Sequence, residues 1–408
     1  MESEIELSEV ITDIAAGPFG SNLKVDCFVP SGFPIIDGAN LKGLKVTDNL
    51  TKFVTEEKAR SLSRSIAKRG DVVVTISGTL GQIAYVPDDS VYEEYLCSQR
   101  QFKVTFDTKR VYVPYLVYYF HTREGQSKIL AFANQTGVPA LAQPTKNFKK
   151  IMLTLPPLQR QKQIASVGEL LTAKIETNSK LNGYLEELLL AQFASLVPNN
   201  KWTEGRADAY YEIGIGKTPP RKEPEWFSNT RTGNHVWLSI KDMGEAGAYS
   251  LDSSEYLTDD AVRAKNVRRV PAGSILLSFK LTVGRVKIAG CDMTTNEAIA
   301  CFSSKDKRML AYAYPFLLSY DYGKLGSTSS IATAVNSKTI KAMPFVVPSD
   351  PELDAFFATT KPVYEQLLAN ANESRSLTAL RDALLPKLIS GEIDVSKVDL
   401  TQLNSHLV

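Results

Sequence analysis

The chain has 408 residues, of which 43% are hydrophobic and 23% charged, and its formal net charge is only +2. This length leaves room for two or three domains of roughly 100–200 residues, and the composition is that of an ordinary globular protein rather than a disordered or uniformly basic one. No apolar run approaches the roughly 20 residues of a membrane helix, so we expect no contact with a membrane and a cytoplasmic location.

The first segment of the chain has the pattern of a mixed α/β domain. A buried strand is expected at 33–36, and a hairpin follows, with strands at 71–76 and 82–86 rich in β-branched residues around a turn that contains two glycines. Next come an alternating strand at 101–106, an amphipathic helix that starts at Pro114 and extends toward Phe132, and a strand at 151–155. The segment therefore predicts strands and helices mixed in one domain.

The second segment repeats this order. A strand at 237–240 corresponds to the first strand, and a hairpin at 273–286 corresponds to the first hairpin at a shift of 203 residues. A further stretch, 145–151, returns at 337–343 with a shift of 192. A period near 200 is far too long for a solenoid, so the sequence predicts a duplicated unit.

Each globular segment is followed by a long helical pattern. We expect domains at 1–155 and 199–348, long helices at 156–198 and 349–393, and a C-terminal tail at 394–408. An apolar seam with two asparagines recurs in both helices at a shift of 192, and its members are Ile164, Leu171, Asn178, Leu185 and Leu188, and Phe356, Val363, Asn370, Leu377 and Leu380. We predict that the helices pair as an antiparallel coiled coil with approximate two-fold symmetry, with a kink or break at Pro362. The alternative is that each helix packs only on its own domain.

The motifs of catalysis are missing from the sequence. Four cysteines and three histidines are scattered with no metal-binding spacing, which predicts reduced structural thiols and no metal site. No nucleophile elbow, Walker A loop or zinc-protease motif is present, and neither the glycine loop nor the target-base motif of a methyltransferase is found. The stretch 214–218 resembles a phosphate loop but lacks the required spacing, so we expect a binding protein rather than an enzyme.

Two basic blocks lie at similar places in the two repeats. Residues 263–287 hold seven Lys or Arg residues and no acidic residue, and residues 58–69 hold five basic residues without an acidic one. Such blocks are able to neutralise phosphates even in a chain of low net charge. One block alone would be read as a solvated face, but two equivalent blocks favour a nucleic-acid surface.

Several motifs resemble those of the specificity (S) subunits of type I restriction–modification enzymes. The segments that carry the resemblance are the glycine-led stretches 17–24 and 216–227, the proline- and glutamine-rich helix start 155–165, and the helix end 377–393. They extend over nearly the whole chain in the order domain, helix, domain, helix. The stretch 349–352 departs from the family because the glutamine-rich start of the second helix is missing.

The resemblance implies an α+β fold with two tandem target-recognition domains and a non-catalytic role. Each domain would recognise one half of an asymmetric, bipartite double-stranded DNA target, and the helix pair would set the spacing and dock modification subunits, expected in two copies. A restriction subunit would join through the complex. No cofactor is expected on this chain, because S-adenosylmethionine, ATP and Mg would act on the partner subunits. Half-sites on one face of B-DNA would lie about one turn, roughly 34 Å, apart.

Polar residues of the loops are the candidate DNA contacts, since Arg and Lys bind guanine edges or phosphates and Gln pairs with adenine. The candidates are Ser21, Lys24, Thr79 and Gln82 in the first domain, and Lys217, Arg221, Lys222, Lys280, Thr282 and Arg285 in the second. Charged residues of the helices are candidates for docking the modification subunit, namely Arg160, Lys162, Arg381 and Lys387. Three alternatives remain: a methyltransferase or nuclease with a degenerate site, a stand-alone DNA-binding regulator, and a coiled-coil scaffold without DNA recognition.

Overall fold

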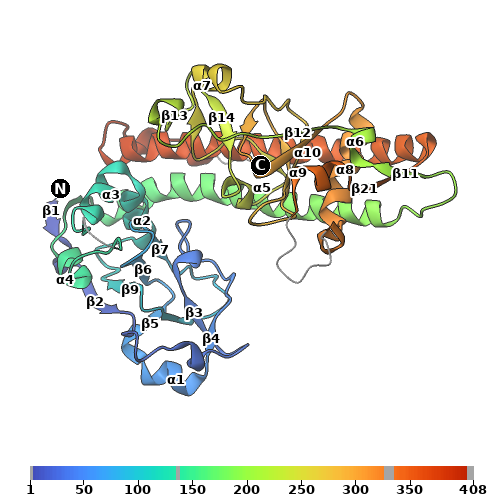
Figure 1. Ribbon diagram of the computed structural model, residues 1–408. Coiled ribbons are helices and arrows are strands. Elements are labelled where there is room, and N and C mark those ends of the chain that lie inside the picture. The colour runs from blue at the N-terminus through green and yellow to red at the C-terminus, as the bar shows by residue number, and fades with distance from the viewer. Residues whose placement is uncertain (1–2, 135–137, 326–334, 402–408) are drawn as a thin grey trace. The chain divides into compact units, whose positions relative to one another are not determined.

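The computed structural model describes residues 3–134, 138–325 and 335–401, and it divides into two compact units (Figure 1). Unit 1 takes in residues 1–173 and 378–408, and unit 2 takes in residues 174–377. The division falls inside both long helices, α5 (Leu158–Ala194) and α10 (Asp350–Ile389). Each helix therefore contributes to both units.

Unit 1 contains two four-stranded sheets and one strand pair. The first sheet has the antiparallel order β2 (Ile11–Ala16), β9 (Gln101–Phe106), β6 (Val72–Thr75) and β7 (Ile83–Tyr85). The second has the order β4 (Phe53–Val54), β3 (Phe33–Ile36), β8 (Glu94–Cys97) and β5 (Ile66–Lys68), with β3 and β8 parallel. Strand β1 (Ser3–Glu6) pairs with β10 (Met152–Leu155).

The short helices of unit 1 are α1 (Glu56–Ser61), α2 (Val113–His121), α3 (Arg123–Leu130) and α4 (Pro144–Lys149). The sequence predicted one helix over the region of α2 and α3. Two helices form because Thr122 has an extended backbone and its side chain accepts the Gly125 N–H, which caps the start of α3.

Unit 2 repeats this plan with one more strand. Its larger sheet has the order β12 (Glu212–Ile215), β20 (Ile299–Ser303), β17 (Ile275–Ser278), β18 (Val286–Ala289) and β15 (Tyr249–Ser250). Its smaller sheet has the order β13 (Phe227–Ser228), β16 (Tyr256–Leu257), β14 (His235–Leu238) and β19 (Thr294–Thr295). Strand β11 (Thr203–Arg206) pairs with β21 (Pro344–Val347), and the short helices are α6 (Ala207–Tyr210), α7 (Asp259–Ala264), α8 (Lys307–Ser319) and α9 (Ser337–Lys341).

The strand orders confirm the predicted duplication. The order β2-β9-β6-β7 of unit 1 returns as β12-β20-β17-β18, and the parallel pair β3–β8 returns as β14–β19. The cores correspond as well: Ile36 and Val73 are buried together in unit 1, as Leu238 and Leu276 are in unit 2. The apolar β-branched run Val72–Thr75 and its counterpart Ile275–Ser278 are buried along their whole length, as expected for central strands.

The long helices pair in antiparallel fashion, as predicted. In unit 2, the Asn178 amide donates to Glu373 at 2.7 Å, and the Asn370 amide donates to Asn182 at 2.8 Å. The partner number falls along α10 as the number rises along α5, which is the register of antiparallel helices. The two asparagines of the predicted seam are therefore paired across the helices, each with a different residue rather than with one another.

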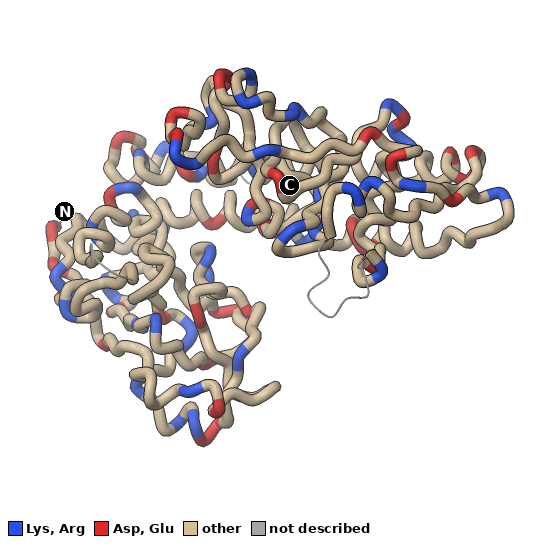
Figure 2. Tube along the Cα trace, in the orientation of Figure 1, with Lys and Arg blue, Asp and Glu red and all other residues tan. Residues whose placement is uncertain are grey.

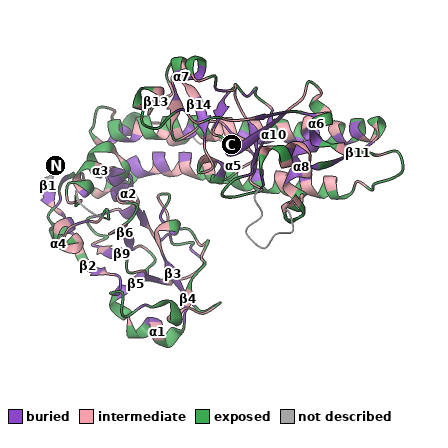
Figure 3. Cartoon of the chain, in the orientation of Figure 1, coloured by how far each residue is buried: buried purple, intermediate pink, exposed green. Residues whose placement is uncertain are grey.

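Burial along the two long helices agrees with most of the predicted seam, and Figure 3 shows buried and exposed residues side by side along both helices. Ile164, Leu171, Asn178, Phe356, Val363, Asn370 and Leu377 are buried, and Leu185 is partly buried. Leu188 and Leu380 were also predicted to pack in the seam, but they are exposed, and Leu189 is buried instead of Leu188. From the start of α10 the inward positions alternate by three and four residues, since Phe356, Thr360, Val363 and Leu367 are all buried. The inward position after Leu185 accordingly lies four residues on, at Leu189, and not three residues on, at Leu188.

Pro362 does not end the second helix. Helix α10 continues from Asp350 to Ile389 with Pro362 inside it. The break that was offered as one outcome at this proline is therefore absent. Within the residues that the structure describes, none of the helices has the length and apolar character that a bilayer crossing requires.

Candidate nucleic-acid interface

Three loops of unit 1 meet at the ends of strands β2, β6 and β8. The Gly17 N–H donates to the Gln101 carbonyl at 2.7 Å, and the Ile76 N–H donates to the Arg100 carbonyl at 2.7 Å. A Cβ atom on Gly17 would lie 1.8 Å from the Ser98 carbonyl oxygen, so this close approach requires glycine. We call residues 17–20, 76–82 and 98–101 the first loop cluster.

Unit 2 builds the same arrangement with the same backbone contacts. The Gly216 N–H donates to the Ile299 carbonyl at 3.1 Å, and the Phe279 N–H donates to the Ala298 carbonyl at 2.9 Å. A Cβ atom on Gly216 would lie 2.2 Å from the Asn296 carbonyl oxygen. Residues 216–219, 279–285 and 296–299 form the second loop cluster, and the glycine-led stretches of the sequence thus occupy equivalent places.

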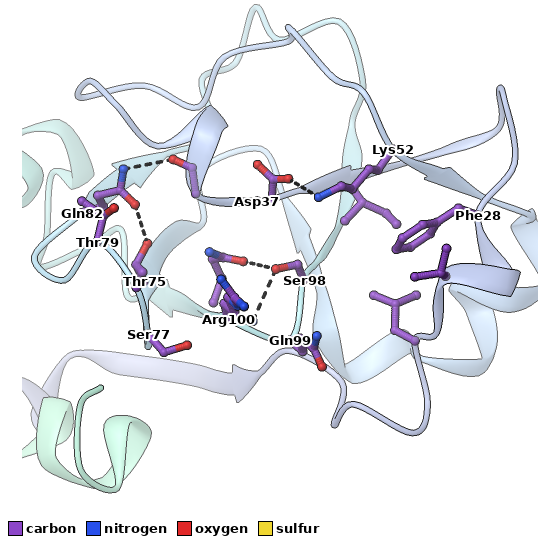
Figure 4. Close-up of a pocket in the computed structure, with 16 residues that line it drawn as sticks. Phe28, Asp37, Lys52, Thr75, Ser77, Thr79, Gln82, Ser98, Gln99 and Arg100 are labelled. Carbon is purple, nitrogen blue, oxygen red and sulfur yellow. Dashed lines mark hydrogen bonds and ion pairs between the residues drawn. The ribbon is translucent and has the colours of Figure 1, made fainter. Parts of the chain in front are cut away.

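A groove of about 480 Å³ opens beside the first loop cluster (Figure 4). Its wall combines strand ends, the hairpin turn and the β8–β9 turn, and the lining residues are Leu23, Val25, Phe28, Ile35, Asp37, Gly38, Lys52, Thr75, Ser77, Gly78, Thr79, Gln82, Ser98, Gln99, Arg100 and Gln101. The wall is mixed, because Leu23, Val25, Phe28 and Ile35 lie among polar residues that are suited to a polar partner.

Many polar groups of this wall are satisfied by one another. The Lys52 ammonium lies 2.7 Å from Asp37, and the Thr75 hydroxyl donates to the Gln82 carbonyl oxygen at 3.0 Å. The Ser98 hydroxyl donates to the Gln101 side chain. Partial burial would raise the pKa of Asp37, but its bonds with Lys52 and the Ala39 N–H outweigh burial and hold the pKa below its ordinary value. These contacts fix the wall and leave few of its groups for a ligand.

Gln99 and Arg100 are different, and sequence reasoning missed them. Both side chains are exposed at the β8–β9 turn on the groove. Within residues 3–134, 138–325 and 335–401, neither side chain has a hydrogen-bond or ion-pair partner, although the Arg100 main chain is bonded. Figure 4 shows both beside Ser98. An exposed guanidinium and an exposed amide on a fixed turn present free donors and acceptors to a partner.

The predicted residues of unit 1 divide into two groups. Thr79 and Gln82 line the groove, whereas Ser21 and Lys24 are exposed outside its lining. The Gln82 amide donates to the Gly38 carbonyl at 3.0 Å and also accepts the Thr75 hydroxyl. Because both ends of its side chain are engaged, Gln82 holds the hairpin in place rather than presenting a free edge.

The predicted residues of unit 2 lie in two places. Lys280, Thr282 and Arg285 belong to the β17–β18 hairpin, and Lys280 and Thr282 are exposed. The Arg285 guanidinium instead points inward and donates to the Ile240 carbonyl at 2.6 Å. The remaining three, which follow β12, are Lys217, Arg221 and Lys222.

These three residues differ in how they are held. The Lys217 ammonium donates to the Lys265 carbonyl at 2.6 Å. Arg221 pairs with Glu255 at 2.7 Å, and its guanidinium lies 4.2 Å from the centre of the Phe227 ring. Lys222 is exposed. Lys217 and Arg221 are thus engaged within the unit.

The basic block of unit 2 carries less free charge than its sequence suggests. Arg263 and Arg269 pair with Asp259, and Lys265 and Arg268 pair with Glu223 and Glu212. Lys287 is buried, and its ammonium donates to the Glu245 carbonyl at 2.6 Å. Basic and acidic residues alternate around α7 in Figure 2.

The block of unit 1 behaves similarly. Arg60 and Lys68 pair with Glu94, and Arg69 pairs with Glu93 at 3.6 Å. These ion pairs range from Arg263 with Asp259, one helical turn away, to Arg60 with Glu94, across a loop. A local charge count does not show ion pairs across loops, so both blocks present less unpaired charge than the sequence suggests.

Family comparison gives a match over most of the chain. Residues 29–187 and 199–369 both match the family model described as the type I restriction modification DNA specificity domain. The two matches contain the two hairpins and the two strand turns of the loop clusters. The duplication is thus visible in the family comparison as well as in the strand order.

Curated relatives carry consistent names. The chain is 22% identical over 373 residues to the type I restriction enzyme MjaIX specificity subunit of Methanocaldococcus jannaschii, which covers 85% of this chain and 82% of that protein. It is 27% identical over 187 residues to the HindI specificity subunit of Haemophilus influenzae, covering 45% of this chain and 39% of that protein.

A solved structure shows a similar fold. The S subunit of a type I restriction–modification system from M. genitalium aligns with a TM-score of 0.51 at 14% sequence identity. The alignment covers 95% of this chain and 96% of that chain. At this identity the likeness establishes the fold and leaves the contacts of individual side chains to be argued from this structure.

Proposed function

Because the chain belongs to the type I restriction modification DNA specificity family, we propose that it recognises double-stranded DNA for a modification enzyme and catalyses no reaction itself. Domains 1–155 and 199–348 each recognise one half of a split target. Methyl transfer, and cleavage where it occurs, belong to partner subunits. The observation that carries this proposal is the groove of the first loop cluster with its two unengaged side chains, Gln99 and Arg100.

The chemistry of these two side chains suits purine edges in the major groove. Arg forms two hydrogen bonds with O6 and N7 of guanine, and Gln forms two with N6 and N7 of adenine. The wall behind them is fixed by its own hydrogen bonds, so little conformational freedom would be lost on binding. Thr79, exposed on the neighbouring hairpin turn, is placed for a phosphate or base contact.

The second loop cluster presents different groups. Strand registers make Glu297 the counterpart of Gln99 and Ala298 the counterpart of Arg100, because Thr295 and Ile299 pair as Cys97 and Gln101 do. A carboxylate accepts a hydrogen bond from cytosine N4, and the Thr218 hydroxyl orients this one. The two domains would therefore select unlike half-sites, which makes the whole target asymmetric.

The helix pair is assigned the spacing of the half-sites and the docking of modification subunits. Helices α5 and α10 each contribute to both units. In unit 2, Leu181, Tyr184 and Leu188 are exposed at helical spacing on α5 and form an apolar stripe suited to a protein partner.

Charged docking contacts receive less support from the structure. Arg381 pairs with Asp382 at 2.9 Å, and Lys387 pairs with Glu392 at 2.9 Å. Lys162 is exposed, and Arg160 lies beside Gly391. The apolar stripe is therefore the stronger candidate for docking. Two modification subunits, and a restriction subunit that joins through the complex, complete the proposed assembly.

Methylation profiling tests the function. The full chain is assembled with a modification subunit and supplied with S-adenosylmethionine and genomic DNA. We expect methyladenine at one asymmetric split motif with a fixed gap, and native mass spectrometry of the assembly should give two modification subunits. A stable complex with an active partner but without sequence-specific methylation would favour a scaffold and contradict the proposal.

A further inference from the structure

The turn of the β17–β18 hairpin holds a leucine in an unusual position. Leu281 has a φ angle of 62° and is 96% exposed. Its counterpart in unit 1, at the shift of 203 residues, is Gly78, whose φ angle is 96°. Glycine adopts this left-handed conformation freely, whereas a residue with a β-carbon does so at a cost in stability. Unit 2 thus has a strained leucine at the position where unit 1 has a glycine.

Local hydrogen bonds explain how the turn is held but not why it has a leucine. The Ser278 hydroxyl donates to the Thr282 carbonyl at 2.5 Å, and the Gly284 N–H donates to the Ser278 carbonyl at 3.0 Å. These bonds use the main chain and Ser278, and none depends on the side chain of residue 281. An aliphatic side chain that is both strained and almost fully exposed gains nothing from the described part of its own chain.

We propose that Leu281 packs against the apolar surface of a base pair in the second half-site, a contact that rests on the proposed DNA recognition. The apolar surface is either the 5-methyl group of thymine in the major groove or the face of a base pair at an opened step. Both surfaces are apolar and can pack against a leucine side chain.

The surroundings of Leu281 favour DNA over a protein partner. Lys280 and Thr282 flank it and are exposed, and the Lys280 ammonium has no ion pair within the described residues. The Lys280 ammonium lies 5.6 Å from the centre of the Phe279 ring, and a cation without an ion pair beside an apolar tip matches a phosphate backbone beside a base edge. The hairpin also borders the β19–β20 turn, because the Phe279 N–H donates to the Ala298 carbonyl. Leu281 therefore belongs to the cluster that is assigned to DNA recognition.

The test uses the full chain assembled with a modification subunit, after wild-type methylation has given the target. Leu281→Gly copies the twin and removes the strain, whereas Leu281→Ala removes the side chain and keeps the strain. We expect both variants to bind the target duplex about 10-fold or more weakly, with the thermal midpoint of Leu281→Gly equal to or above that of the wild type. Val91→Ala, which trims another exposed aliphatic side chain, should bind normally.

Two kinds of modified DNA distinguish the apolar surfaces. If the thymine methyl is the contact, uracil at one position of the second half-site weakens wild-type binding and leaves Leu281→Gly unaffected. If a base step is opened, 2-aminopurine at that step brightens with the wild type and not with Leu281→Gly. Weakened binding with neither signal would overturn the base contact.

Other outcomes separate this inference from the function on which it rests. A wild-type complex that methylates a split motif, with Leu281→Gly equal to it in affinity and profile, would overturn the role of Leu281 alone. Loss of the modification subunit from Leu281→Gly would assign the residue to a protein contact and also overturn it. A wild type without sequence-specific methylation would contradict the proposed function itself.

Discussion

The two loop clusters share a backbone framework and differ in the side chains that they present. The main-chain N–H groups of Gly17 and Gly216 donate to equivalent carbonyls at the β8–β9 and β19–β20 turns. The N–H groups of Ile76 and Phe279 form a second equivalent pair of bonds with the same turns. At the turn itself, Gln99 and Arg100 of the first cluster are replaced by Glu297 and Ala298 in the second. Specificity can therefore change at the turn without disturbing the bonds that hold it.

A second comparison separates positioning from recognition. The Gln82 amide donates to the Gly38 carbonyl, and the Arg285 guanidinium donates to the Ile240 carbonyl, which is the equivalent place after β3 and β14. Two different side chains thus make equivalent hydrogen bonds that hold the hairpin to the neighbouring loop, and we call each of these bonds a brace. Both are candidates for DNA contact by residue type, and in the structure both side chains hold the hairpin.

The shared framework predicts the largest effect. Gly17→Ala places a Cβ atom 1.8 Å from the Ser98 carbonyl, and Gly216→Ala places one 2.2 Å from the Asn296 carbonyl. Each substitution should lower the free energy of unfolding by about 1–3 kcal/mol or more, which urea denaturation measures. Each should also reduce methylation, which methylation profiling measures. Gly43→Ala is the control, because nothing lies within 4 Å of its Cβ position. Equal stability of all three variants would refute the common framework.

The difference between the clusters predicts the next effect. Arg100→Ala should weaken binding of the target duplex by about 1–3 kcal/mol and relax preference at one base pair of one half-site only. Competition binding with single-base variants of the target measures both. Arg123→Ala removes an exposed arginine of α3 and is the matched control for charge. If the control lost as much affinity and the preference stayed sharp, Arg100 would contribute charge and no base recognition.

The braces predict a smaller effect. Gln82→Ala should cost about 1 kcal/mol of stability, the usual value for one intramolecular hydrogen bond, and should speed hydrogen exchange near Gly38. Arg285→Ala should do the same near Ile240. The bases selected should stay unchanged in the methylation profile. A changed base preference would assign these residues to recognition instead of support.

The smallest predicted effect is the pH dependence that Asp242 gives to the loop after β14 in unit 2. Asn40 and Asp242 are equivalent, and each accepts a main-chain N–H, from Asp37 and Ser239 respectively. Partial burial would raise the pKa of Asp242, but hydrogen bonds from Ser239 and Ser254 outweigh it and lower that pKa. A carboxyl group whose pKa is lower in the folded state than in the unfolded state stabilises the fold. This stabilisation is present above the unfolded pKa of about 3.9 and is lost as pH falls through the folded pKa.

Hydrogen exchange of residues 239–245 from pH 6 to pH 3 measures this effect. The wild type should lose protection at the acid end, and Asp242→Asn, which copies unit 1, should lose less. The region 37–43 is not a clean control, because Asp37 also has a lowered pKa. Identical acid profiles for wild type and Asp242→Asn would show that the carboxylate does not govern this loop.

The sequence was sufficient for the architecture because the architecture depends on local patterns. The hairpins at 71–86 and 273–286, the two long helices and the duplication are all visible in the spacing of β-branched and apolar residues. The seam was predicted less well at Leu188, because the inward position lies four residues after Leu185, at Leu189, and not three.

The candidate site was harder to predict because the hydrogen-bond partners of its side chains are distant in sequence. The Arg285 guanidinium is engaged because it donates to a carbonyl 45 residues away. The Arg100 guanidinium has no partner among the described residues. Neither fact can be read from the local sequence. The shifts of 203 and 192 residues found in the sequence do not align 98–101 with 296–299, and only the strand registers show that these turns are equivalent. The strained position of Leu281 was hidden, because only the backbone angle reveals it.

The assignment of one half-site to each loop cluster is tested by the methylation profile of a double variant, Gln99→Glu with Arg100→Ala, compared with that of the wild type. The variant gives the first cluster the turn residues of the second. We predict that the first half of the motif changes, while the second half and the gap stay as in the wild type. An unchanged motif, or a change in both halves, would contradict the assignment of one half-site to each loop cluster.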